Sequence, residues 1–388
     1  MLTKISLLLF CILSFMLKLK AQQVIQFDVR PPSEAVTHSP LLYIAGDFNG
    51  WHTADTAFQL KKDSRGHYTL QTTITAGEHN YKIVRGSWET VETNKDGTQR
   101  DNRHLTIPTA NSEKEQQIEI QIENWADNFA PQMVKSTAAS NVLVLDSLFF
   151  MPQLKRQRRI WLYLPLDYDK SKRSYPVLYL QDGQNVFDAA TAYAGEWGVD
   201  EYLNQLTIRQ ACIVVAIDNG GNQRMQEYNP YTNKQFGKAE GKAYSLFLAK
   251  TLKPYIDKHY RTMTGPRFTT IAGSSMGGLI SFYTAISYPE VFGNAGVFSP
   301  SFWIAPKIFK EAEKQLPYLA SSAFYFYGGG KEGDSLIENL TKMQQLFAKQ
   351  PGLRQKTAVI AAGQHNEKFW QEAFPGFYRW LLKLEAQK

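Results

Sequence analysis

The sequence has little cysteine, with only two such residues in 388. Cys11 lies in the apolar N-terminal run, and Cys212 lies in the apolar stretch "ACIVVAID". If the N-terminal run is removed on export, Cys212 has no partner, which excludes an internal disulfide framework. We therefore expect a buried Cys212 thiol and a fold stabilised by core packing, which a chain of this length can supply.

Long hydrophobic runs are also lacking. The longest is the run of about eleven residues from Leu7 to Leu17, too short to span a bilayer but typical of a signal-peptide core. Residues 1–21 are therefore predicted to be a signal peptide ending at Ala21, so the chain is expected to be secreted or periplasmic. No later segment is long and apolar enough to predict a membrane span.

A strong charge imbalance and metal-ligand patterns are absent as well. The formal charge is +7, and loss of the three lysines in the predicted signal leaves +4, too little to indicate nucleic-acid binding. The one dense basic cluster, "KRQRR" from Lys155 to Arg159, is interpreted as a solvated strand edge. The histidines show no metal-ligand spacing, so neither a metal nor another cofactor is expected.

Two parts of the chain differ in pattern. Residues 22–126 contain short alternating apolar runs separated by Gly, Asn and Asp, which predicts an antiparallel β-sandwich of the immunoglobulin-like kind. Residues 127–140 are small and polar, and form the predicted linker. Residues 141–388 alternate apolar strands with helical segments such as "SLIENLTKMQQLFAKQ", which predicts a mainly parallel sheet with helices on both faces.

One strand–turn–helix pattern carries chemistry. In "FTTIAGSSMGGLISFY" a serine, Ser275, stands between Gly273 and Gly277, and Gly278 follows. A Gly-x-Ser-x-Gly turn between a strand and a helix is typical of a nucleophile elbow, which exposes the serine hydroxyl above the sheet. The backbone N–H of Met276 would lie at the helix N-terminus, where it can stabilise an oxyanion.

A serine nucleophile needs a base and a carboxylate that orients the base. His365 is the only histidine after Ser275, and it directly follows the last apolar strand. Two carboxylates follow the preceding strand, Glu332 and Asp334; Glu332 is favoured because it is closer to the strand end, with Asp334 as the alternative.

The second oxyanion donor is predicted in "VLYLQDGQNVFD". The N–H of Gln184 is the first candidate and that of Asn185 the second, because Gly183 permits a close backbone approach. Asp182 is interpreted as a loop-shaping hydrogen-bond acceptor.

These motifs resemble the esterase family of α/β-hydrolases that includes esterase D, carbohydrate esterase family one and enterobactin esterases. The resemblance rests on "VLYLQDGQNVFD", "GEWGVDE", "VVAIDNGGNQRMQEYNPY", "GSSMGG", "FSPSFW" and "GQHNEKFW". It implies an α/β-hydrolase fold, Ser275 as nucleophile and His365 as base. Many relatives carry an Asp in a Gly-x-x-Asp loop, where this chain has "GGKE" and hence Glu332, which keeps Asp334 open.

The N-terminal part resembles a family-48 carbohydrate-binding module through "LYIAGDFNGW" and "NYKIVRGSWETVETNKDGTQRDNR". Such a module implies glycan binding by an exposed indole. Trp88 is the candidate, while Trp51 is expected to be buried. A rigid structural appendage is the alternative role.

Together these features predict an exported serine esterase acting on feruloyl or acetyl esters of plant polysaccharide. The alternatives are a siderophore esterase of the enterobactin trilactone type and a non-catalytic glycan-binding protein. Trp303 and Trp197 are candidate walls of the acyl pocket, with core packing as the alternative for each. Arg224 and Glu227 are expected to form a loop ion pair.

Overall fold

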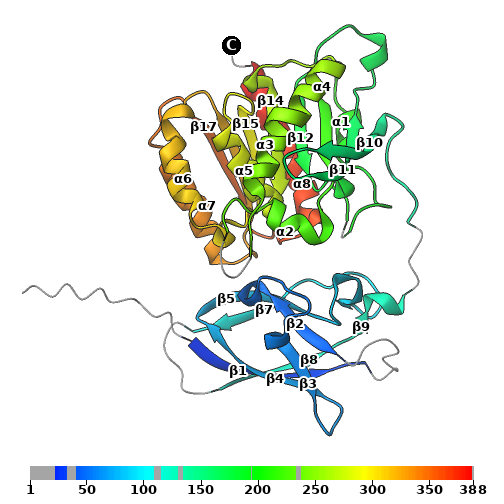
Figure 1. The fold of residues 1–388 in the computed structure, drawn as a ribbon, viewed down its shortest axis with the longest axis vertical. Helices are drawn as coiled ribbons and strands as arrows, with labels where there is room; N and C mark the ends of the chain where they lie inside the picture. The colour runs from blue at the N-terminus through cyan, green and yellow to red at the C-terminus, as the bar shows by residue number, and fades with distance from the viewer. Residues whose placement is uncertain are drawn as a thin grey trace, which may run out of the picture. The chain divides into compact units, whose positions relative to one another are not determined.

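The computed structural model describes residues 22–32, 41–108, 115–129, 134–193, 195–232 and 237–386 (Figure 1). The chain divides into two compact units, Met1–Ala130 and Pro131–Lys388. The division falls within the segment predicted as a linker. The predicted signal peptide, residues 1–21, lies outside the described residues.

The described part of the first unit contains strands and short 3₁₀ turns only. Its strands are β1 (Gln22–Arg30), β2 (Leu42–Gly46), β3 (Gln59–Lys62), β4 (Tyr68–Thr75), β5 (Gly77–Val84), β6 (Glu92–Thr93), β7 (Arg103–Ile107), β8 (Gln116–Gln121) and β9 (Asn124–Trp125).

Seven of these strands form one sheet in the order β7-β5-β2-β3-β4-β1-β8, and β6 pairs with β9. Alternate residues of β1, namely Ile25, Phe27 and Val29, are fully buried, which is the period-two pattern of a strand with one core face. The immunoglobulin-like character of this unit stays a prediction.

The second unit is built on an eight-stranded sheet in the order β10-β11-β13-β12-β14-β15-β16-β17. Its strands are β10 (Val142–Met151), β11 (Arg156–Tyr163), β12 (Val177–Gln181), β13 (Ile213–Ile217), β14 (Thr269–Ser274), β15 (Asn294–Phe298), β16 (Ala323–Gly329) and β17 (Arg354–Ile360).

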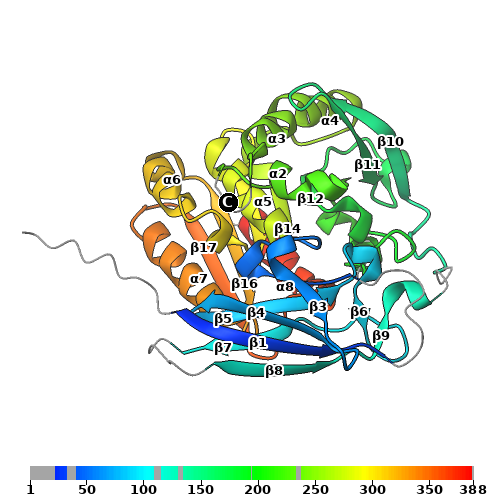
Figure 2. The same ribbon diagram turned by 60° about the horizontal axis from the view of Figure 1, so that its bottom comes forward.

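Strand β11 is antiparallel to both of its neighbours, β10 and β13. The six strands β13, β12, β14, β15, β16 and β17, given in sheet order, run parallel to one another. The predicted mainly parallel sheet is confirmed. Figure 2 shows β10 and β11 at one end of this sheet and β17 at the other.

Helices cover both faces of this sheet. They are α1 (Val199–Asn204), α2 (Arg224–Glu227), α3 (Gly241–Phe247), which continues through a π-helical turn at Leu248–Leu252 into α4 (Lys253–His259), α5 (Met276–Ser287), α6 (Ile308–Gln315), α7 (Asp334–Phe347) and α8 (Glu367–Ala386).

Two apolar cores follow from this layering. One contains side chains of α3 to α7, and the other contains side chains of α1 and α8. Figure 1 shows α3 and α5 in front of the sheet and α8 behind it. Among the described residues, no helix combines the length and the apolarity needed to cross a membrane.

Strand β10 is an element that the sequence pattern did not reveal. It is an edge strand with two irregularities in its pairing to β11, and its side chains Leu143, Val144, Leu148 and Phe150 are exposed. Because a clean alternation of buried and exposed positions is missing, period-two reasoning fails here.

The interpretation of "KRQRR" as a solvated edge holds for the exposed Lys155 and Gln157 and is wrong for the arginines. Arg158 is only 7% exposed and donates to both carboxylate oxygens of the fully buried Glu227, at 2.7 and 2.8 Å. Arg159 donates to Asp218 at 2.7 Å. The basic residues therefore tie β11 to the loops that follow β13, because a buried charge requires a partner.

Candidate active site

Ser275 stands on a sharp turn between β14 and α5. Its backbone angles are φ 56° and ψ −120°, a left-handed conformation that a residue with a side chain adopts only when its surroundings enforce it. The Ser275 N–H donates to the carbonyl of Phe298 at 2.9 Å, and its carbonyl accepts from the N–H of Ser301 at 3.1 Å. The turn is thus held by the neighbouring strand β15 and the loop that follows it.

The three glycines around Ser275 are required by close backbone approaches. A Cβ on Gly273 would lie 2.8 Å from the Gly277 backbone, and one on Gly277 would lie 2.9 Å from Asp182 Oδ2. A Cβ on Gly278 would lie 2.8 Å from the carbonyl oxygen of Phe298. Any larger residue at these positions would push α5 away from the sheet, so the motif matches the space available.

A hydrogen-bonded chain leads from Ser275 through His365 to Glu332. His365, in the loop between β17 and α8, places Nε2 2.9 Å from Ser275 Oγ and Nδ1 2.6 Å from Glu332 Oε2. A carboxylate accepts only, so Nδ1 carries the imidazole proton and Nε2 accepts from the serine hydroxyl. His365 is therefore poised to remove the Ser275 proton.

Glu332 is the carboxylate that the structure brings to His365. Its side chain is 2% exposed, and its Oε1 accepts from the Gly329 N–H and from the Ser299 hydroxyl, each at 2.7 Å. Three donors in total, from Gly329, Ser299 and His365, hold this carboxylate in one orientation.

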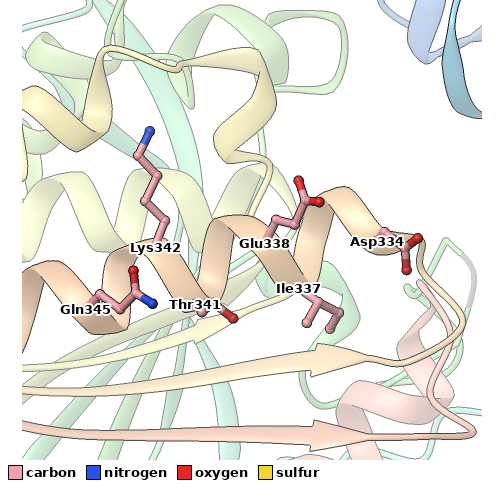
Figure 3. Close-up of a pocket in the computed structure, with 6 residues that line it drawn as sticks. All are labelled: Asp334, Ile337, Glu338, Thr341, Lys342 and Gln345. Atoms are coloured by element: carbon pink, nitrogen blue, oxygen red, sulfur yellow. The ribbon is translucent and has the colours of Figure 1, made fainter. Parts of the chain in front are cut away.

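Asp334 lies elsewhere. It is exposed in the first turn of α7, and it lines a shallow hollow of about 370 Å³ on the outer surface of that helix (Figure 3). The other lining residues are Ile337, Glu338, Thr341, Lys342 and Gln345. The alternative acid thus faces solvent and is not hydrogen-bonded to His365.

The two acids should respond differently to loss of charge. We expect Glu332→Gln to lower kcat about 10²-fold, because an amide holds the imidazole in the wrong tautomer and stabilises imidazolium poorly. Asp334→Asn, the matched control two residues away, should stay within about twofold of the parent rate, as surface changes usually do. Steady-state hydrolysis of an aryl acetate measures both, and the reverse ranking would reassign the acid.

The predicted oxyanion donors occupy suitable backbone positions. Met276 is the first residue of α5, and the first N–H groups of a helix have no intrahelical acceptor. Gln184 lies in the 3₁₀ turn Gly183–Asn185 after β12. The residue before this turn, Asp182, approaches Gly277 of the elbow. The N–H of Asn185 donates to the Asp182 carbonyl at 2.9 Å, so the second candidate is already used and Gln184 is retained.

Family comparison agrees with this architecture. Residues 152–381 match the model of a family described as "Putative esterase". The chain belongs to this esterase family. The esterase assignment covers the described sheet from the loop between β10 and β11 to α8.

Individual relatives of this chain carry different names. It is 28% identical over 245 residues to the uncharacterized protein YjcH of Bacillus subtilis (strain 168), covering 60% of this chain and 95% of that protein. It is 28% identical over 227 residues to an endo-1,4-beta-xylanase/feruloyl esterase of Xylanibacter ruminicola, covering 57% of this chain and 29% of that protein.

The chain is also 30% identical over 230 residues to an iron(III) enterobactin esterase of Escherichia coli (strain K12). This match covers 58% of this chain and 50% of that protein. Among solved structures, the BES protein from Bacillus cereus superposes with a TM-score of 0.53 at 18% identity. That match covers 64% of this chain and 97% of that chain, and it supports the α/β architecture of the second unit.

The Asp182 carboxylate shapes the loop beside the elbow of this esterase, as predicted. It accepts from Arg224 Nε at 2.7 Å and Nη2 at 2.9 Å, and from Asn219 Nδ2 at 2.8 Å. The expected ion pair between Arg224 and Glu227 is therefore wrong. Glu227 is buried and forms its ion pairs with the arginines of β11. Arg224 pairs instead with Asp182, in the loop after β12.

The three tryptophans predicted to bind substrate have different environments. Trp197 is 6% exposed and packs edge-on against Phe298, so it belongs to the core and does not wall a pocket. Trp303 is 40% exposed in the turn Phe302–Ile304. Trp88 is half-buried in the first unit, and its ring centroid lies 6.1 Å from that of Trp51. Trp51 is also half-buried, whereas the sequence predicted it to be buried.

Among the described residues, no group of His, Cys, Asp and Glu side chains could hold a metal ion. Four residues near the site were missed by sequence reasoning: Ser299, Ser301, Glu367 and the Asp182 partner Asn219. The serines flank a proline just after β15 in "FSPSFW", and that position at a strand end was the available signal.

Glu367 lies two residues after His365 in the first turn of α8. Burial raises the pKa of Glu367 from its ordinary 4.5 to about 7; the nearby Asp182 adds to this rise, and His365 and Arg224 oppose it. Asn185 Nδ2 donates to its Oε1 at 3.4 Å. Near neutral pH this carboxyl group is therefore protonated in part of the folded population.

A pH dependence of stability follows. Between its ordinary pKa of 4.5 and about 7, the folded chain keeps a proton on Glu367 that the unfolded chain releases, so stability falls as pH rises. We expect Glu367→Gln to make the decline of Tm across this range shallower. Thermal unfolding at several pH values measures it, with the exposed Glu372→Gln of the same helix as control. An unchanged slope in Glu367→Gln would contradict the assignment.

Proposed function

We propose that this protein is a serine ester hydrolase with Ser275 as nucleophile, His365 as general base and Glu332 as the acid that orients it. The observation that carries the proposal is the Glu332–His365–Ser275 hydrogen-bond chain on a strained elbow. The family membership agrees with it. A glycan-binding protein without activity would have no need for a strained serine aligned with a histidine and a buried carboxylate.

The proposed reaction has two halves. Ser275 Oγ attacks the ester carbonyl carbon while His365 Nε2 takes the hydroxyl proton, and the developing oxyanion accepts from the N–H groups of Met276 and Gln184. His365 then protonates the leaving alcohol, which leaves an acyl group on Ser275. A water molecule gives its proton to His365 and attacks the acyl carbon, which releases the acid and restores the serine.

Feruloyl or acetyl esters on plant polysaccharide are the proposed substrates. This reading is supported by the similarity to a xylanase/feruloyl esterase and by the resemblance of the first unit to a carbohydrate-binding module. The exposed indole of Trp303, two residues beyond Ser301, is the proposed wall for an aromatic acyl group. A siderophore trilactone is the second candidate, because an enterobactin esterase is 30% identical over 230 residues.

One substrate panel separates these candidates. The purified protein is assayed on an aryl acetate, methyl ferulate, acetylated xylan and ferric enterobactin. Preference for methyl ferulate or acetylated xylan by kcat/KM supports the sugar-ester reading, and preference for enterobactin supports the siderophore reading. Absence of hydrolysis of every ester, including the aryl acetate, would overturn the enzyme proposal.

The first unit is proposed to bind glycan through Trp88. We expect Trp88→Ala to lower the rate on feruloylated or acetylated xylan severalfold, because tethering raises the effective substrate concentration. The rate on a small aryl ester should not change, which serves as the internal control. Equal rates on the polymer for both proteins would remove the glycan role and leave the unit as a structural appendage.

A further inference from the structure

The turn Ser299-Pro300-Ser301 follows β15 and contains two buried serines. Ser299 is 1% exposed and Ser301 is 4% exposed, although both carry a polar hydroxyl. Ser299 has φ 42°, a left-handed conformation that glycine or asparagine adopts more readily. A buried hydroxyl requires a hydrogen-bond partner, so the partners of these two serines indicate what the turn does.

The direction of the hydrogen bonds at Ser299 is fixed by chemistry. Trp370 Nε1, which can only donate, lies 3.0 Å from Ser299 Oγ, so Ser299 accepts there. The single proton of Ser299 is then available to Glu332 Oε1 at 2.7 Å. Ser299 thus donates to the oxygen of Glu332 that does not contact His365.

The same reasoning fixes the direction at Ser301. The Ser275 hydroxyl uses its proton on His365 Nε2, because Nδ1 already carries the imidazole proton next to Glu332. Ser275 Oγ can therefore only accept from the Ser301 hydroxyl, 3.2 Å away. The Ser301 N–H also donates to the Ser275 carbonyl at 3.1 Å, so Ser301 binds both the backbone and the side chain of the elbow.

We propose that Ser299 and Ser301 are positioning residues that fix the two ends of the Glu332–His365–Ser275 chain from one rigid turn. Ser299 holds the Glu332 carboxylate directed at His365, and Ser301 holds the Ser275 hydroxyl in the rotamer that faces Nε2. This inference rests on the proposed function and adds to it the residues that set the distance between acid and nucleophile. Both act through another residue, Ser299 through Glu332 and Ser301 through Ser275.

The first test replaces each hydroxyl in the full-length chain. We expect Ser301→Ala and Ser299→Ala each to lower kcat about tenfold, the typical loss for one hydrogen bond in an aligned site, with KM within about twofold. Ser301→Thr keeps the hydroxyl and should recover most of the rate. Ser281→Ala, a fully buried serine in α5, is the matched control and should keep the parent kcat.

A double-mutant cycle separates positioning from general structural damage. If Ser299 acts through Glu332, Ser299→Ala should cost about tenfold in the parent protein and almost nothing in the Glu332→Gln background. For Ser301, the rate at which a fluorophosphonate labels Ser275 should fall about tenfold in Ser301→Ala while Tm stays within about 2 °C of the parent value. The labelling rate stays informative if Ser301→Thr does not fold.

Several outcomes overturn the inference. A kcat within twofold of the parent for Ser301→Ala does so, as does an undiminished loss for Ser299→Ala in the Glu332→Gln background. Full activity in Ser275→Ala would overturn the proposed function and this inference together. Loss of activity in Ser275→Ala without loss in either serine variant would overturn the inference alone.

Discussion

Ser275→Ala should lower the rate of ester hydrolysis at least about 10³-fold while leaving the fold intact. The variant lacks the only atom at the elbow that can attack a carbonyl carbon and pass its proton to His365 Nε2. The fold should persist because the backbone bonds of residue 275 to Phe298 and Ser301 do not involve the side chain. Alanine carries a Cβ in the same place as serine, so the left-handed backbone conformation of residue 275 is no more strained in the variant.

The measurement is steady-state hydrolysis of an aryl acetate, with circular dichroism and thermal unfolding to check the fold. Ser274→Ala is the matched control, since Ser274 ends β14 and is buried directly beside the nucleophile. It should keep most of the parent rate. Activity of Ser275→Ala within about tenfold of the parent protein would reject the nucleophile assignment.

His365→Ala should be nearly as damaging as Ser275→Ala, because base and nucleophile act as a unit and removal of either leaves the other without a function. The loss should exceed that of Glu332→Gln, since an amide at residue 332 still holds the ring in place whereas alanine at 365 removes the base. Activity of the parent protein should also fall with decreasing pH, because a protonated imidazole cannot accept the Ser275 proton.

The control for this variant is His259→Ala in α4, whose ring stacks on Tyr255 and takes no part in the site. It should leave kcat unchanged. A rate that does not fall on acidification of the parent protein would contradict a histidine base. Retained activity in His365→Ala would do the same independently of any pH effect.

The sequence alone identified the elbow and the base for local reasons. The Gly273, Ser275 and Gly277 spacing lies within five consecutive residues, so the motif can be recognised without knowledge of distant contacts. His365 followed by elimination, because no other histidine comes after the nucleophile. The parallel sheet followed from apolar runs that alternate with helical periodicity. The runs of β12, β13, β14 and β15 are buried on both faces as expected, whereas the run of the edge strand β17 is only partly buried.

Only the tertiary structure decided between Glu332 and Asp334. The two carboxylates are two residues apart in the sequence, and their local sequence does not say which of them turns inward. The choice depends on where Gly329, Ser299 and His365 lie, and these come from three different segments of the chain. The structure also decided against Asn185 as an oxyanion donor, because in the folded turn its N–H donates to the Asp182 carbonyl.

The remaining differences from the sequence-based predictions have two physical causes. Arg224 pairs with Asp182 instead of the nearby Glu227, and Trp197 packs in the core instead of at the site. In both cases the contact joins residues that are far apart in the sequence and are brought together only by folding. Strand β10 was missed because an edge strand need not alternate buried and exposed residues. The chain therefore determined by itself which groups are available for chemistry. The register of the sheet and the packing of its loops determined which of them meet.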